Sequence, residues 1–217
     1  MTLYRHYKNK PYKFMGVVKH SESLEDLVLY ETLYDNPLGK FWVRPKIMFF
    51  ESIEHDGMLK PRFEKVLVDI KNATSFDGPM RSLIGSLAAQ CFPEWNEMDF
   101  EKRLKTYDHF QIAIAQVDGK AVAFKIGYPL STTNFYSWLG AVIPEYEGTG
   151  IATILMKAQH EWAVSKGFHR IRTKCLNFNK TMLILNLKHG FEVIDTELTE
   201  QGLKLILEKR LLEGEYS

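Results

Sequence analysis

The sequence predicts an α+β protein in which a small all-β region precedes a larger region of mixed helices and strands. Two observations predict this class. The first 65 of the 217 residues alternate short apolar runs with turn residues and show no helical period. From residue 66 onward, strand-like runs alternate with segments whose apolar residues recur at helical spacing. We therefore expect two domains, at residues 1–65 and 66–217.

The first region contains four expected strands, at residues 12–18, 27–33, 41–44 and 48–53. Turn-forming residues separate them, with Asp35-Asn-Pro-Leu-Gly39 before the third strand and Glu54-His-Asp-Gly57 after the fourth. So many short strands pack most naturally as a small SH3-like barrel or as a small sheet.

The second region begins with an expected strand at 66–70 and an expected helix at 80–92, which Pro93 ends. Asp118-Gly119 supplies a tight turn between two later strands. The remaining expected elements are a helix at 100–104, strands at 110–116, 121–127 and 135–142, a helix from 151 to about 167, a strand at 170–174, a helix at 180–188, and strands at 191–195 and 203–208.

Composition and charge exclude several classes of protein. Charged residues make up 25% and apolar residues 45% of the chain, which is typical of a folded protein. The formal net charge of +1 argues against a nucleic-acid partner. The N-terminus lacks the apolar core of a signal peptide and no run is long enough to span a membrane, so we expect a cytoplasmic protein. Cys91 and Cys175 have no metal-site spacing, and we expect reduced thiols and no metal.

A glycine-containing turn is the most informative segment. The expected strand Trp138–Val142 leads to Gly148 and Gly150, and an amphipathic helix follows directly. Backbone N–H groups at such a turn and at a helix N-terminus bind anions, which indicates a pyrophosphate site. A dinucleotide-binding motif is excluded because Thr153 stands where the third glycine of that motif would be.

These residues resemble the coenzyme A signature of the Gcn5-related N-acetyltransferase (GNAT) family. Glu147-Gly-Thr-Gly-Ile-Ala152 follows Val142-Ile-Pro144, and Glu147 stands where the family has Gln or Arg. Asn179-Lys-Thr-Met182 and Lys188-His-Gly-Phe191 match a second family segment in the correct order.

The resemblance covers about residues 66–210. It implies the GNAT fold, a mostly antiparallel mixed sheet flanked by helices, and acetyl-CoA as the acyl donor in a bacterial-type N-acetyltransferase. The residues implied to bind the donor are Gly140, Val142, Gly148, Thr149, Gly150, Ile151, Ala152 and Asn179.

The resemblance also implies direct attack of an amine on the thioester. Asn186 stands where many members of the family have a tyrosine that protonates the leaving thiolate, and an amide cannot act as that acid. Phe92-Pro-Glu94 resembles a segment of arylalkylamine N-acyltransferases whose Glu serves as the base. We therefore name Glu94 as a catalytic candidate. Tyr136 and Tyr128 are further candidates because they lie on or beside expected central strands and could reach the thioester, although most strand tyrosines only pack.

Other titratable residues are given a structural interpretation. His109 and His189 lie at expected element ends, where histidines are mostly structural or exposed. Cys175 follows a strand that borders the expected cleft, but no His and Asn or Asp partner for a thiol nucleophile is identifiable, so an inert thiol is favoured.

The first region resembles the DUF1653 family, a small bacterial domain without an assigned function. The resemblance rests on segments such as Tyr4-Arg-His-Tyr-Lys8, Trp42-Val-Arg-Pro45 and Pro61-Arg-Phe63. Five of its residues suggest an aromatic and basic surface, although a domain this small also needs aromatic residues for its core: His6, Tyr7, Trp42, Arg44 and Arg62.

Three functions remain open at this stage. The first is an N-acetyltransferase acting on a small-molecule or peptide amine, and the second is an acyl-CoA-binding sensor or docking module with weak catalysis. The third, an enzyme that modifies nucleic acid or ribosomal protein, is disfavoured by the balanced charge. The sequence does not identify the acceptor, and it leaves homodimer formation open.

Overall fold

The computed structural model describes residues 2–34, 36–107 and 109–211. The chain divides into two compact units. The first contains the residues up to Asp69 with segments 117–120 and 145–151, and the second contains 70–116, 121–144 and the chain from Ala152 onward. The domain boundary at residues 65/66 stays a prediction.

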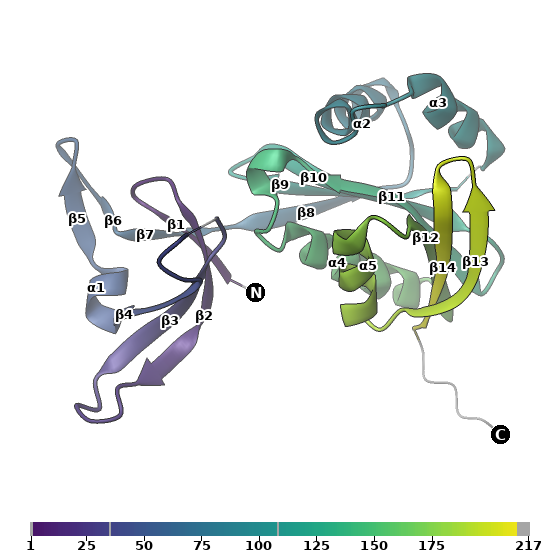
Figure 1. Ribbon diagram of the computed structural model, residues 1–217. Helices are drawn as coiled ribbons and strands as arrows, with labels where there is room; N and C mark the ends of the chain where they lie inside the picture. The colour runs from purple at the N-terminus through teal and green to yellow at the C-terminus, as the bar shows by residue number, and fades with distance from the viewer. Residues whose placement is uncertain (1, 35, 108, 212–217) are drawn as a thin grey trace. The chain divides into compact units, whose positions relative to one another are not determined.

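The first unit is built on a five-stranded sheet with the strand order β4-β3-β2-β1-β7, and its described pairings are antiparallel (Figure 1). A separate two-stranded hairpin and one short helix complete the unit. Its elements are β1 (Thr2–His6), β2 (Pro11–Lys19), β3 (Asp26–Thr32), β4 (Phe41–Pro45), α1 (Lys46–Phe50), β5 (Ser52–His55), β6 (Met58–Pro61) and β7 (Phe63–Val66). Of the two alternatives, barrel or sheet, the described pairings give the sheet.

The strand expected at residues 48–53 is wrong in its first half, because α1 occupies Lys46–Phe50 and β5 begins only at Ser52. Pro45 stands at the N-cap of this helix. The helical turn brings Phe49 into full burial, with its ring stacked on that of Phe63 at a centroid distance of 4.1 Å. Burial of this one large side chain outweighs the strand preference of a segment too short to show a helical period.

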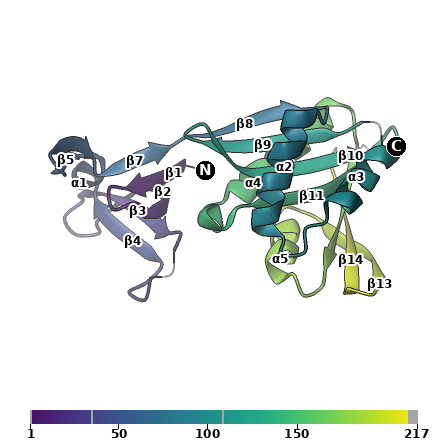
Figure 2. The same ribbon diagram turned by 90° about the horizontal axis from the view of Figure 1, so that it is seen from above.

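The second unit is a seven-stranded sheet with the order β13-β14-β12-β11-β10-β9-β8. Helices α2 and α3 lie on one face, and α4 and α5 lie on the other (Figures 1 and 2). The elements that follow β7 along the chain are β8 (Val68–Ala73), α2 (Gly78–Cys91), α3 (Glu97–Thr106), β9 (Gln111–Val117), β10 (Lys120–Pro129), β11 (Asn134–Val142), a 3-10 turn (Pro144–Tyr146), α4 (Ile151–Ser165), β12 (Arg170–Leu176), α5 (Lys180–Lys188), β13 (Glu192–Thr199) and β14 (Gly202–Arg210).

Local sequence signals explain several element boundaries of the second unit. The Asp77 carboxylate accepts a hydrogen bond of 2.8 Å from the Met80 N–H and so caps α2. Asn96 caps α3 in the same way. The β9–β10 turn places Asp118 and Gly119 at φ 52° and 78°, as the expected tight turn requires.

The single strand expected at 66–70 is in fact two strands, because β7 ends at Val66 and β8 begins at Val68. The sequence shows an unbroken apolar run at Val66-Leu-Val68, which crosses the boundary between the two strands, and β7 pairs with β1 while β8 belongs to the second sheet.

Candidate active site

Strands β11 and β12 are parallel neighbours that stay paired over only part of their length. The described pairs are Asn134 with Arg170, Phe135 with Ile171 and Tyr136 with Arg172. Beyond Tyr136, β11 runs on to Val142 and β12 runs on to Leu176 with no further described pair between them. The sheet therefore opens between these two strands.

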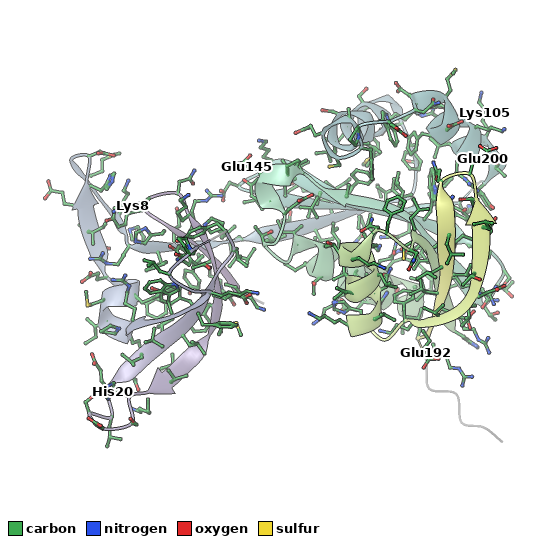
Figure 3. The ribbon with its side chains drawn as sticks, viewed as in Figure 1. Lys8, His20, Lys105, Glu145, Glu192 and Glu200 are labelled. Atoms are coloured by element: carbon green, nitrogen blue, oxygen red, sulfur yellow. The ribbon has the colours of Figure 1, made fainter. Side chains whose placement is uncertain are left out.

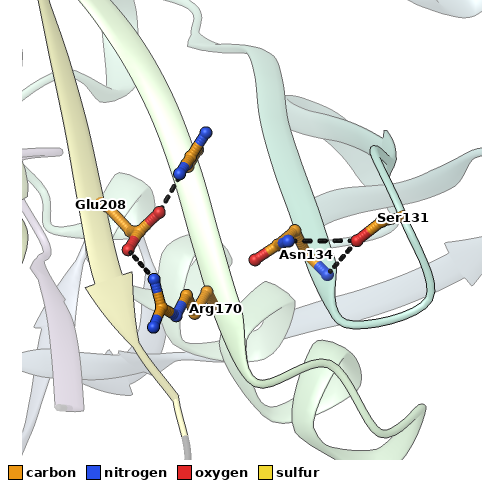
Figure 4. Close-up of polar contacts among 5 residues, drawn as sticks. Ser131, Asn134, Arg170 and Glu208 are labelled. Carbon is orange, nitrogen blue, oxygen red and sulfur yellow. Dashed lines mark hydrogen bonds and ion pairs between the residues drawn. The ribbon is translucent and has the colours of Figure 1, made fainter.

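Polar contacts hold the paired end of this opening (Figure 4). The Glu208 carboxylate of β14 accepts hydrogen bonds from Arg170 at 3.1 Å and from Arg172, both on β12. At the β10–β11 turn, the Ser131 hydroxyl accepts hydrogen bonds from the backbone and side-chain nitrogens of Asn134, both at 3.1 Å. These contacts join β12 to β14 and close the β10–β11 turn, and they lie at the end where β11 and β12 are still paired.

An irregularity in β11 coincides with the start of the opening. Ile126 of β10 pairs with Leu139, and the next residue, Gly127, pairs with Ser137. Trp138 therefore has no partner on β10 and forms a bulge. Bulges bend and twist a strand, which accounts for the turning of β11 away from β12 at this point.

A cavity of about 1230 Å³ occupies the opening. Figure 3 marks Lys105 at the end of α3 and Glu200 in the β13–β14 turn, and both α3 and that turn contribute neighbouring residues to the lining. The lining from β11 and β12 comprises Tyr136, Ser137, Trp138, Leu139, Gly140, Arg172, Thr173, Lys174, Cys175 and Leu176. Both strands thus face one large cavity beyond their last shared pair.

The structure brings some of the expected donor-binding residues together and separates others. Gly140 and Asn179 line the large cavity. Val142 and Ala152 line a smaller cavity of about 70 Å³ that Gly140 also borders. Asn179 has a second role, because its side chain caps α5 by accepting a 3.1 Å hydrogen bond from the Met182 N–H.

In the turn before α4, the groups available to bind an anion belong to the backbone and not to the side chains. Gly148 and Gly150 have φ values of 71° and 84°, a conformation that favours glycine. The Thr149 side chain is buried and donates a hydrogen bond of 2.5 Å to the Tyr146 carbonyl, and the Ile151 side chain is buried as well. Thr149 and Ile151 can therefore contribute to anion binding only through their peptide N–H groups, and that of Thr149 also donates a 3.4 Å hydrogen bond to the Tyr146 carbonyl.

Both catalytic candidates line the large cavity. Glu94 is exposed in the loop between α2 and α3, and Tyr136 lies on β11 at the last pair before the opening. Burial raises the pKa of Tyr136. The third candidate, Tyr128, is buried, and its pKa is raised first by burial and then by a hydrogen bond with Tyr107.

None of the cationic residues of the lining was named as a site residue from the sequence, and two of them, Arg103 and Lys125, make contacts that bear on the site. Arg103 of α3 lies 5.7 Å from the ring centre of Trp138 and donates a 3.4 Å hydrogen bond to the Tyr128 hydroxyl. Lys125 of β10 borders both cavities. Its sequence signal is a single charge within the otherwise uncharged run Ala121–Gly127.

The remaining titratable or polar candidates differ in their environments. Burial raises the pKa of the Cys175 thiol, which opposes formation of a nucleophilic thiolate. His109 is exposed, and His189 caps the C-terminal end of α5. Asn186 is only 2% exposed and lines the cavity, and its side-chain nitrogen has no hydrogen-bond partner among the described residues.

Over residues 2–34, 36–107 and 109–211, no group of three or more His, Cys, Asp or Glu side chains is arranged to hold a metal ion. Within the same ranges, every helix is too short or too polar to cross a membrane.

A sheet that opens between two parallel strands around a cavity, with a glycine turn ahead of the following helix, places the second unit in the class of α+β acyltransferases. The model of the acetyltransferase (GNAT) family matches residues 81–191, about half of the chain, and the protein belongs to that family. Residues 2–65 match a family described as a protein of unknown function, DUF1653. The expected family assignments and the GNAT fold are confirmed.

Solved structures show the same fold at low sequence identity. The ribosomal-protein-S18-alanine N-acetyltransferase from Escherichia coli is 16% identical with a TM-score of 0.59, and the match covers 69% of this chain and 97% of that one. A GNAT family acetyltransferase from Elizabethkingia anophelis with acetyl-CoA bound is 16% identical with a TM-score of 0.52, over 65% and 97% of the two chains. The aminoglycoside 6'-N-acetyltransferase from Enterococcus faecium is 14% identical with a TM-score of 0.56, over 67% and 98%.

Proposed function

We propose that the protein transfers an acetyl group from acetyl-CoA to a primary amine by direct attack within a ternary complex. The opening between β11 and β12 is the observation that carries this proposal. Peptide groups of β11 beyond Tyr136 have no described strand partner on the β12 side, so they can pair with the amide groups of a pantetheine chain.

The turn before α4 is the proposed pyrophosphate site. The peptide N–H groups of residues 148–152 include those of the first helical turn, which have no partner within the helix. The helix dipole adds a partial positive charge at the same end. Gly140 and Asn179, which border the large cavity, would contact the part of the donor nearer the thioester.

The acceptor amine would enter from the part of the cavity lined by Glu94, Trp95 and Arg103. Its nitrogen forms a bond to the thioester carbon, the carbon–sulfur bond breaks, and the sulfur keeps the electron pair. Glu94 takes the proton of the amine, directly or through a water molecule. Tyr136, at the paired end of the opening, would orient the amine through its hydroxyl group, which stays protonated because burial raises its pKa.

The acceptor is proposed to be a small-molecule or peptide amine, because the lining mixes aromatic rings with charges of both signs. A location in a bacterial cytoplasm and assembly into a homodimer stay predictions from the sequence.

Substitution of Gly150 tests the donor site. Gly150→Asp adds a carboxylate where the pyrophosphate is proposed to bind. At about 4 Å, repulsion between two unit charges amounts to about 1 kcal/mol in water and about 4 kcal/mol at a partly buried site, which predicts a loss of affinity of about tenfold or more. Titration calorimetry with acetyl-CoA measures it.

Gly167→Asp is the matched control, because Gly167 follows the other end of α4 and has a similar φ of 81° against 84° for Gly150. It introduces the same strain and charge away from the proposed site, and its acetyl-CoA affinity should equal that of the unsubstituted protein. Equal affinity in both variants would contradict the proposed pyrophosphate site.

Release of coenzyme A from acetyl-CoA, measured across a set of primary amines and peptide N-termini, tests the activity itself. Amine-dependent release supports the transferase. Tight acetyl-CoA binding without release for any amine would favour the acyl-CoA-binding sensor instead.

A further inference from the structure

Lys125 lies on β10 directly opposite a residue without a side chain. Its register partner on β11 is Gly140, and a Cβ atom at that position would lie 3.4 Å from the Cγ of Lys125. The aliphatic part of the Lys125 side chain therefore lies over Gly140 of β11, and Lys125 borders the cavity in the opening between β11 and β12. A larger residue at position 140 would crowd this side chain.

Two groups on α5 face the same cavity as Lys125. Met182 borders both cavities that Lys125 borders, and Asn186 lies one helical turn further along and lines the large one. The buried side-chain nitrogen of Asn186 is an unused hydrogen-bond donor among the described residues. An ammonium group and an amide donor are thus directed into the opening with no described acceptor.

The electrostatic surroundings of Lys125 contain no described carboxylate partner. Burial alone lowers the pKa of Lys125, to about 8. The positive charge of Lys125 acts on His160 of α4, whose own pKa is lowered to about 3, first by burial and then by Lys209 and Lys125. His160 is therefore neutral near pH 7, and Lys209 of β14 lies 3.4 Å from its Nδ1 atom.

Several charged groups on the other elements around the cavity are paired. Arg172 of β12 is bound to Glu208, and Lys174 of the same strand is bound to Glu197 of β13 at 2.7 Å. The rest of the charged or titratable lining is Glu94, Arg103, Tyr107, Tyr128, Tyr136, Cys175 and Lys204.

We propose that the Lys125 ammonium group donates a proton to the sulfur of coenzyme A as the acetyl group leaves. The inference rests on the proposed acetyl transfer and names the acid of that reaction. Asn186 cannot fill this role because a carboxamide does not give up a proton, but its free N–H can donate a hydrogen bond to the same sulfur.

The proton balance of the step is complete without a further reactant. The amine nitrogen bonds to the acetyl carbon and loses one proton to Glu94. The carbon–sulfur bond breaks toward sulfur, and the sulfur takes a proton from Lys125. Neutral Lys125 regains a proton from Glu94 through water, or from solvent, when coenzyme A leaves.

The test measures the thiol pKa of bound coenzyme A, read from the ultraviolet absorbance of its thiolate at a series of pH values. It uses the full chain and needs no acceptor amine. A cation within about 4–6 Å lowers the pKa of an acid by about 1–3 units. In the unsubstituted protein, the bound thiol should therefore titrate about one unit or more below free coenzyme A.

Three variants complete the test. In Lys125→Met, burial without a cation should place the thiol pKa above that of free coenzyme A. Lys125→Arg keeps the charge but cannot release a proton, so the lowered thiol pKa should persist while amine-dependent turnover falls. The control is Lys166→Met, because Lys166 is exposed beyond the end of α4, and its thiol pKa and turnover should match the unsubstituted protein.

Two outcomes would contradict the proposed role of Lys125 and leave the proposed acetyl transfer intact. One is an equal thiol pKa with and without Lys125. The other is acetylation of Lys125 by acetyl-CoA, detected by mass spectrometry, because an acetylated lysine has no proton to donate. Failure of coenzyme A to bind at all would instead contradict the proposed function.

Discussion

Both units bury aromatic rings in a core, since Phe49 is fully buried in the first unit and Phe135 in the second, but the two units differ in a further use of aromatic side chains. In the first unit, the buried rings belong to one closed cluster in which Phe49 stacks on Phe63. In the second unit, Tyr136 and Trp138 line a cavity of about 1230 Å³. The difference comes from the sheets, since the first is paired across its five strands and the second opens between β11 and β12. Aromatic content alone therefore does not distinguish a core from a binding site.

The largest expected effect concerns the open cavity. Glu94→Gln removes the proposed base, and loss of a positioned base typically lowers turnover by about 10²–10⁴-fold. Steady-state turnover on an amine that supports coenzyme A release measures it, and the loss should shrink as pH rises because more of the amine is already deprotonated.

Glu161→Gln is the control for Glu94, because Glu161 is exposed on α4 and makes no described ion pair. Its turnover and pH profile should match those of the unsubstituted protein. An unchanged pH profile in Glu94→Gln would remove Glu94 from the mechanism and point to ordered water as the base.

The next effect concerns the closed core. Phe49→Ala removes a fully buried ring and should lower the free energy of unfolding of the first unit by about 3–5 kcal/mol. Phe50→Ala, at a neighbour that is 47% exposed, should cost much less. Hydrogen exchange of amides in β1–β3 under denaturant measures both.

The acetyl-CoA affinity of Phe49→Ala shows whether the core of the first unit also affects donor binding. If the aromatic core of the first unit is purely structural, affinity stays unchanged in Phe49→Ala under conditions where the second unit is folded. If Phe49→Ala lowered the free energy of acetyl-CoA binding by as much as it lowers the free energy of unfolding of the first unit, the aromatic core of the first unit and the cavity of the second unit would not be independent.

The smallest effect concerns His160, a buried histidine of the second unit. Its pKa falls from 6.5 to about 3 on folding, so the unfolded chain binds more protons than the folded one at intermediate pH. Stability is therefore lost as the pH falls below about 6.5. Between pH 7 and pH 5 the loss should be about 2 kcal/mol, at about 1.4 kcal/mol for each pKa unit.

Hydrogen exchange of the α4 amides at the two pH values measures this loss. His160→Gln should reduce the pH dependence by about 2 kcal/mol. His20→Gln, at an exposed position of the first unit, should leave it unchanged. Equal pH dependence in the two variants would mean that His160 is protonated in the folded protein.

Much of the fold was predictable because its signals are local. Helix α5 has the expected bounds, Lys180–Lys188, and the Asp118-Gly119 turn joins the expected strands. Helix α1 was missed because five residues are too few to show a helical period, and tertiary burial of Phe49 determines the conformation. The apolar run Val66-Leu-Val68 is divided between β7 and β8 because the two strands pair in separate sheets, and the sequence does not display this pairing.

The candidate site was predictable only in part. Resemblance to known families named Glu94 and Gly140, and an expected place on a central strand named Tyr136; all three line one cavity, and their roles stay predictions. Lys125 was missed because its significance depends on its register opposite Gly140 and on the opening of the sheet. Both are long-range properties that appear only when strands are paired.

A crystal structure of the full chain with acetyl-CoA tests the central claim most directly. The account predicts the pyrophosphate on the peptide N–H groups of residues 148–152, the pantetheine chain along β11 beyond Tyr136, and the thioester sulfur within reach of Lys125. Acetyl-CoA bound elsewhere, with the opening between β11 and β12 empty, would contradict the account.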